Sequence, residues 1–192
     1  MNSGDGYSVM SASVPASRQL DLSVPIHELP RWVYILSAVL MIVPLVPFVL
    51  AHDMLALLYG IHPLEVLVGF VLLIVLHEGI HAIGWKIASG LPWSAFTFGF
   101  AWRAMAPYCH AKQPMNVRAY RIGAVLPLIL TGIVPWLIGL ALADATITVL
   151  GTLLITGAVG DIYVLWSLRE MPASARVIDH ESNAGCVVLL DA

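Results

Sequence analysis

The chain has 192 residues, of which 59% are hydrophobic and only 11% are charged, and its formal net charge is -3. Its mean hydropathy of +0.88 is far above that of soluble globular domains, so the composition predicts an integral membrane protein with one transmembrane domain. No long basic run is present, which argues against a nucleic-acid partner. The two cysteines, Cys109 and Cys186, fit neither a disulfide framework nor a cysteine-based zinc motif.

The first apolar run begins only after a polar segment. Residues 1–31 are rich in Ser, Pro, Gly and Asp and show no periodicity, which predicts a flexible tail. Residues 32–51 are long enough to cross a bilayer, and Pro44 and Pro47 are expected to kink this segment. Residues 52–63 are then expected to form a short loop.

Further apolar segments follow, and each is long enough to span a bilayer. They lie at residues 64–87, 122–143 and 145–168. The C-terminal tail, residues 169–192, is polar except for residues 186–190, which predict a short strand.

The loop between the second and third spans, residues 88–120, is the one substantial non-spanning region. Residues 94–100 alternate aromatic with small or polar side chains, which is typical of a strand, and residues 104–111 are its expected partner. Bare sheet edges are not stable in lipid, so this hairpin is expected at the membrane interface or against the helices. The strand at 186–190 is expected beside it. The predicted fold is an all-α membrane protein with four transmembrane helices and a small interfacial β-hairpin.

The basic residues predict the orientation. With four spans, all nine Lys and Arg residues fall in the two tails and the 88–120 region or at the adjoining helix ends. Because positively charged segments remain in the cytoplasm, both termini and the long loop are expected there.

The second span carries the sequence H-E-x-x-H, at His77, Glu78 and His81. On a helix, residues i and i+4 lie on nearly the same face about 6 Å apart along the axis, so the two histidines can bind one metal ion. Glu78 points about 100° away from His77 and is free to accept a proton from water activated by the metal. Ionisable residues are costly inside a membrane and usually line a functional cavity. The alternative is that these side chains tie helices together by hydrogen bonds.

A catalytic zinc site usually has three protein ligands, and depth in the membrane indicates the third. Asp161 lies about 12 Å from the cytoplasmic end of its span, counted from Arg169 at 1.5 Å per residue. The histidines lie about 10 Å from the same end, counted from Lys86. We therefore expect His77, His81 and Asp161 to hold Zn²⁺, although Asp161 would otherwise find a hydrogen-bond partner on a neighbouring helix.

Two further residues are accessory candidates. His110, in the 88–120 loop, either folds back as a ligand or proton shuttle or is simply solvated. Thr131, in the third span, either faces the site or bonds its own backbone.

The H-E-x-x-H motif in a membrane helix, followed by Gly160-Asp161 in a later span, resembles the site-2 protease clan of intramembrane zinc metalloproteases. Residues 106–110, 122–127 and 160–162 more closely resemble the putative zincin peptidase family of small four-span bacterial membrane proteins. This resemblance implies a zinc-dependent endopeptidase of the bacterial cytoplasmic membrane that cleaves membrane-anchored proteins.

A non-catalytic reading also remains open. Site-2 proteases typically carry an Asn-Pro element that this chain lacks, which favours a metal-stabilised membrane binding or scaffold protein. The presence of Glu78 favours the enzyme, because a purely structural zinc site has no need of a base.

Overall fold

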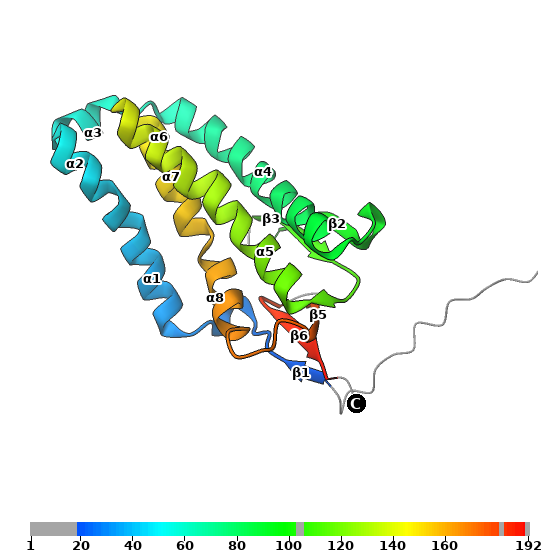
Figure 1. The fold of residues 1–192 in the computed structure, drawn as a ribbon. Coiled ribbons are helices and arrows are strands. Elements are labelled where there is room, and N and C mark those ends of the chain that lie inside the picture. The colour runs from blue at the N-terminus through cyan, green and yellow to red at the C-terminus, as the bar shows by residue number, and fades with distance from the viewer. Residues whose placement is uncertain (1–18, 103–105, 181–182, 191–192) are drawn as a thin grey trace, which may run out of the picture.

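The structure is a computed structural model that describes residues 19–102, 106–180 and 183–190 (Figure 1). It is mostly helical, as the sequence predicts. Within the described residues, four helical segments are long and apolar enough to cross a membrane. They are Arg31–His52, Pro63–Ser89, Val117–Leu142 and Ala145–Ser167.

The first segment is interrupted where the prolines predict. Helix α1 (Arg31–Ile42) passes through a 3-10 turn (Val43–Leu45) into α2 (Val46–His52). The break follows from Pro44 and Pro47, because proline lacks the N–H that continues an α-helix.

The prediction of a short loop at residues 52–63 is wrong, because this region contains helix α3 (Met54–Gly60). Asp53 begins the helix: its carboxylate accepts a hydrogen bond from the N–H of Ala56 at 2.8 Å. An N-cap of this kind satisfies one of the otherwise unpaired donors of the first turn.

The second segment is the single long helix α4 (Pro63–Ser89). The third consists of α5 (Val117–Pro127), the π-helical turn η5 (Leu128–Ile133) and α6 (Val134–Leu142). It starts five residues before the predicted span, since Asn116 caps α5 by accepting from the N–H of Ala119 at 2.7 Å.

The fourth segment consists of α7 (Ala145–Gly157) and α8 (Val159–Ser167), which meet at Ala158. The outer surfaces of the four segments are apolar. Leu50, Leu72 and Leu142 are 82%, 65% and 67% exposed. Such side chains are favourably solvated by lipid tails rather than by water.

The predicted hairpin is present between α4 and α5. Strand β2 (Phe96–Ala101) pairs antiparallel with β3 (Ala106–Ala111), with Phe96 opposite Ala111. Its location at a membrane interface stays a prediction.

A second sheet was not predicted. It has the strand order β1 (Gln19–Asp21), β6 (Cys186–Leu189), β5 (Arg176–Asp179), β4 (Met115–Asn116). The strand expected at residues 186–190 therefore exists, but its expected pairing with the hairpin is wrong: β6 pairs with β5 and β1. Both expected tails contribute strands, and the remainder of those tails, residues 1–18 and 191–192, lies outside the described residues.

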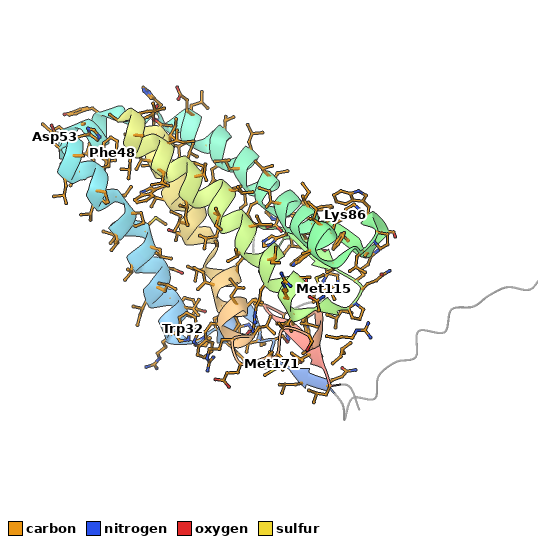
Figure 2. The ribbon with its side chains drawn as sticks, viewed as in Figure 1. Trp32, Phe48, Asp53, Lys86, Met115 and Met171 are labelled. Carbon is orange, nitrogen blue, oxygen red and sulfur yellow. The ribbon has the colours of Figure 1, made fainter. Side chains whose placement is uncertain are left out.

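The sheets and the helix ends around them form one pole of the molecule, and α2 and α3 form the other (Figure 1). Lys86 and Met115 lie at the sheet pole, whereas Asp53 lies at the opposite pole (Figure 2). The four-stranded sheet covers a core in which Val117, Leu168 and Val188 have no exposed surface. This packing fixes the sheet against the ends of α5 and α8.

Candidate metal centre

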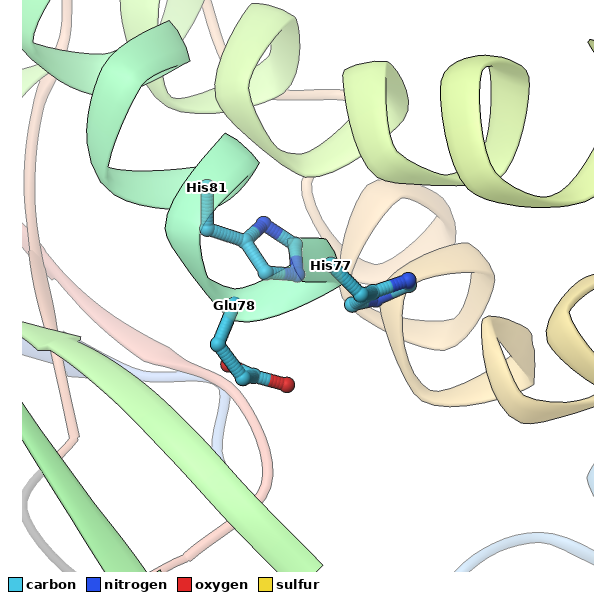
Figure 3. Close-up of side chains that lie close together, drawn as sticks. All are labelled: His77, Glu78 and His81. Atoms are coloured by element: carbon cyan, nitrogen blue, oxygen red, sulfur yellow. The ribbon is translucent and has the colours of Figure 1, made fainter. Parts of the chain in front are cut away.

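The structure brings the two histidines of the motif to one carboxylate. Nε2 of His77 lies 3.2 Å from Oδ2 of Asp161, and Nε2 of His81 lies 3.3 Å from Oδ1. The histidines are 7% and 6% exposed. They lie one helical turn apart on α4, while Asp161 lies in the first turn of α8. Figure 3 shows His77, Glu78 and His81 projecting from α4 toward one shared space.

The other ring nitrogen of each histidine has a defined partner. Nδ1 of His81 lies 3.0 Å from the carbonyl oxygen of Gly123, and a carbonyl can only accept, so this nitrogen carries a proton. Nδ1 of His77 lies 3.2 Å from Oγ1 of Thr131. That hydroxyl donates its own proton to the carbonyl of Pro127 at 2.8 Å, so it accepts from His77.

These partners determine which nitrogen is available for a cation. A neutral imidazole protonated on Nδ1 presents a lone pair on Nε2. Both Nε2 atoms face the Asp161 carboxylate, so three electron-rich groups converge on one small region. Such an arrangement is stable only with a cation between the groups, either a metal ion or a proton on the imidazoles.

The donor set fits zinc. Two imidazole nitrogens and one carboxylate are a ligand set found in zinc peptidases, with bonds of about 2.0–2.2 Å. Tetrahedral geometry with such bonds puts neighbouring ligand atoms about 3.3–3.6 Å apart. The separations of 3.2 Å and 3.3 Å from Asp161 to His77 and His81 are close to this range.

Close contact between α4 and α5 makes the Gly123 hydrogen bond possible. A Cβ atom on Gly123 would lie 2.1 Å from Cδ1 of Trp85, and one on Gly84 would lie 2.9 Å from Cα of Gly123. Only glycine permits the two backbones to approach this far. The approach places the carbonyl of Gly123 beside His81.

The π-helical turn η5 provides the hydrogen-bond partner of His77. Thr131 lies within η5 and has no exposed surface. Turns of this kind often occur at functional sites, because the extra residue reorients the side chains around it. Here the turn includes the hydroxyl that contacts His77.

Glu78 lies beside the histidines and contacts the hairpin. Its Oε2 accepts a hydrogen bond from the N–H of Cys109 on β3 at 2.7 Å. Ligand-type atoms of His77, Glu78 and His81 lie within 4.8 Å of one another. Glu78 is thus held by the hairpin while its carboxylate stays beside the histidines, which is a suitable position for a base next to the metal site.

A cavity of about 420 Å³ adjoins this cluster and is lined by Glu78, Cys109, His110, Asp161 and Asp179 among others. Burial raises the pKa of the Cys109 thiol to about 12, so this thiol is protonated at neutral pH when no metal ion contacts it.

His110 does not join the His77 and His81 cluster. Its Nδ1 lies 3.3 Å from Oδ2 of Asp179 in β5. Sequence reasoning missed Asp179, because a carboxylate in a polar C-terminal segment carries no pattern. Only the pairing of β5 with β4 brings it to the cavity.

Comparison with known proteins decides the family. Residues 70–176, more than half of the chain, match the model of a family described as "Putative zincin peptidase". The chain belongs to this family. The matched range includes the H-E-x-x-H motif and Asp161 but ends before Asp179. Membership of the zincin peptidases indicates a metallopeptidase with zinc as its metal.

The chain is also similar to a curated protein whose description states no function. An "Uncharacterized 24.7 kDa protein in gap 5'region" from Pyrococcus woesei is 30% identical over 118 residues, which are 59% of this chain and 52% of the relative. The chain thus spans about half of that relative's length. No solved structure matches.

Proposed function

We propose that this protein is an intramembrane zinc metallopeptidase that hydrolyses peptide bonds in membrane-anchored proteins. One observation carries the proposal: two histidine lone pairs and one carboxylate converge in a buried site, with Glu78 beside them. The cluster lies within helices that are long and apolar enough to cross a membrane. Membership of the zincin peptidase family supports the same conclusion.

In this proposal His77, His81 and Asp161 hold the metal. Bound Zn²⁺ supplies Lewis acidity, which makes water acidic enough to lose a proton near neutral pH and polarises a peptide carbonyl. Thr131 and the carbonyl of Gly123 keep both Nε2 lone pairs directed at the site, because each occupies the opposite ring nitrogen.

Glu78 is the proposed general base. Its carboxylate takes a proton from the attacking water as the water oxygen bonds to the carbonyl carbon. When the carbon–nitrogen bond breaks, Glu78 gives this proton to the leaving amine. The hydrogen bond from the N–H of Cys109 holds one carboxylate oxygen, Oε2, in place and leaves the other available for the proton.

The proposed membrane orientation follows from the charges. The Lys and Arg residues of the described segments lie at the sheet pole, and we propose that this pole faces the cytoplasm. They lie at the start of α1, the end of α4, the start of α5, in β5 and just after α8 and β3, and they are Arg31, Lys86, Lys112, Arg118, Arg121, Arg169 and Arg176. The protein then belongs in a cytoplasmic membrane, with the metal centre near its cytoplasmic side.

Reporter insertions test this orientation. A reporter after Lys112 is expected to be cytoplasmic, and one at Asp144, between α6 and α7, is expected to be external. An external reading at Lys112 would place the site on the opposite face of the membrane.

Metal analysis and a base variant test the chemistry. Purified wild type is expected to contain zinc, whereas His77→Ala and Asp161→Ala lose it. Glu78→Gln is expected to retain zinc but lose about a hundred- to ten-thousand-fold in rate. The matched control is Glu65→Gln, because Glu65 is an exposed carboxylate at the other end of α4.

The same variants separate the enzyme from a scaffold. Membrane proteomes of a deletion strain complemented with each variant are compared. With an enzyme, full-length forms of a membrane-anchored protein accumulate with Glu78→Gln and not with Glu65→Gln. If Glu78→Gln restores every wild-type phenotype, the protein acts by binding through a metal-stabilised fold, and the peptidase proposal is wrong.

A further inference from the structure

A second polar cluster lines the cavity next to the metal centre. Nδ1 of His110, on β3, lies 3.3 Å from Oδ2 of Asp179, at the end of β5, and their side chains are only 18% and 15% exposed. Asp179 has two further donors: the hydroxyl of Tyr120 lies 2.6 Å from Oδ1, and the N–H of Ala111 lies 3.4 Å from Oδ2. Three groups from two separate parts of the chain, β3 and α5, thus contact this carboxylate.

The carboxylate orients the imidazole of His110. An ionised carboxylate only accepts hydrogen bonds, so Nδ1 of His110 is the donor in this pair. A carboxylate in this position fixes the ring orientation and stabilises the ring when it is positively charged. The hydroxyl of Tyr120, whose side chain is buried, donates to the other oxygen of Asp179 and restrains the carboxylate from that side. His110 therefore has a defined orientation rather than that of a solvated loop residue.

Strand β3 connects this pair to the proposed base. The N–H of Cys109 donates to Glu78, and the N–H of Ala111, two residues on, donates to Asp179. In an antiparallel pair the N–H groups of alternate residues point from the same edge of a strand. His110 lies between these two contacts, and its side chain lines the cavity together with that of Glu78.

We propose that His110, oriented by Asp179, donates a hydrogen bond to the carbonyl oxygen of the peptide bond being cleaved. This inference rests on the proposed peptidase function. As the water oxygen bonds to the carbonyl carbon, the carbonyl oxygen gains an electron pair and negative charge, which the Nε2–H of His110 stabilises. Because Nδ1–H is directed at Asp179, the ring donates from both nitrogens and acts as an imidazolium, which keeps both protons throughout. The charge returns to the carbonyl when the carbon–nitrogen bond breaks, and the amine receives the proton that Glu78 took from water. Asp179 is a positioning residue.

This inference makes the C-terminal segment part of the working site. Asp179 lies beyond residue 176, where the match to the family model ends. Its position depends on β5, which pairs with β4 immediately before α5 and with β6. The sheet that joins the two ends of the described chain thereby supports a group in the cavity.

The test uses the full-length zinc-loaded protein in detergent with a library of quenched fluorescent single-span peptides. His110→Ala is expected to lower kcat about 100- to 1000-fold, the usual effect of removing a donor to a developing oxyanion. KM, zinc content and the unfolding midpoint are expected to match wild type. His110→Gln, whose amide retains an N–H donor, is expected to recover part of the loss, and Asp179→Asn is expected to lower kcat about tenfold or more. The control is His27→Ala, since the side chain of His27 is 80% exposed.

A second measurement does not depend on turnover. Nitrogen-15 spectra of histidine-labelled Glu78→Gln protein are expected to show His110 protonated on both Nδ1 and Nε2, with a changed signal when Asp179→Asn is added. An unprotonated Nδ1 or Nε2 would overturn the inference even if His110→Ala failed to fold.

The kinetic outcomes separate this inference from the function on which it rests. Unchanged kcat in zinc-loaded His110→Ala, with Glu78→Gln inactive, overturns the role of His110 alone. Loss of zinc in His110→Ala makes His110 a metal ligand and also overturns it. If wild type and Glu78→Gln treat every peptide alike, the peptidase proposal fails and this inference fails with it.

Discussion

Replacing Thr131 by valine removes the hydroxyl that accepts from Nδ1 of His77 and hardly changes the volume of the side chain. Thr131 has no exposed surface, so we expect no water to replace the lost partner of Nδ1. An unpaired buried donor costs about 1–3 kcal/mol. Loss of an outer hydrogen-bond partner of a metal ligand typically lowers metal affinity about 10- to 100-fold, which corresponds to about 1.4–2.8 kcal/mol. The two ranges agree, and we expect Thr131→Val to weaken zinc binding by this factor.

Zinc affinity measured by competition with a chelator is the assay. Thr152→Val is the matched control, because Thr152 is 2% exposed and its hydroxyl donates to the carbonyl of Thr148 at 2.9 Å. Thr131 makes the same type of bond to Pro127 at 2.8 Å, so both variants lose one backbone contact but only Thr131→Val affects a histidine. Thr131→Ser retains the acceptor and is expected to retain the affinity. Equal zinc affinity in Thr131→Val and Thr152→Val would refute the assignment of Nδ1 as the proton carrier in His77.

Three further outcomes are expected. Gly123→Ala is expected to be destabilised by at least about 1–3 kcal/mol, because its Cβ would lie 2.1 Å from the ring of Trp85. Gly157→Ala is the control and is expected to be tolerated, because no atom lies within 4 Å of its Cβ. Thermal unfolding measures the difference in stability. Burial raises the pKa of both the Cys109 and the Cys186 thiols to about 12. The unfolded chain therefore loses these protons at lower pH than the native protein, so stability falls as pH rises from about 9 to 12, less steeply when each cysteine is replaced by alanine. Free zinc at about 100 times its dissociation constant is expected to add about 2.7 kcal/mol to the stability of wild type, and much less to variants that lack a proposed ligand.

The helical segments and the motif follow from the sequence because their signals are local. Span length depends on runs of apolar residues, and the common face of His77 and His81 depends only on the period of a helix. Asp161 required one further comparison. The helical rise per residue gives the distance of each residue from the cytoplasmic end of its span, and this distance is similar for Asp161 and for the two histidines. The structure brings Asp161 within 3.3 Å of both histidines. The role of Asp161 as a ligand stays a prediction.

The four-stranded sheet and the position of Asp179 depend on strand pairing between distant parts of the chain. Strand β1 pairs with β6, so residues 19–21 lie beside residues 187–189. No periodicity in such short strands indicates this partner, because pairing depends on the surface that the helices leave to be covered. The same holds for Asp179, which reaches the cavity only through β5.

The proton positions in the proposed site also depend on tertiary structure. The sequence shows which side chains can bind zinc, but not which nitrogen of His77 or His81 is free to do so. That choice depends on the carbonyl of Gly123 and the hydroxyl of Thr131, both from the third helical segment. A hydrogen bond acts over about 3 Å, whereas these partners lie 42 and 54 residues away along the chain. Only the packing of α4 against α5 and the π-helical turn brings them into contact.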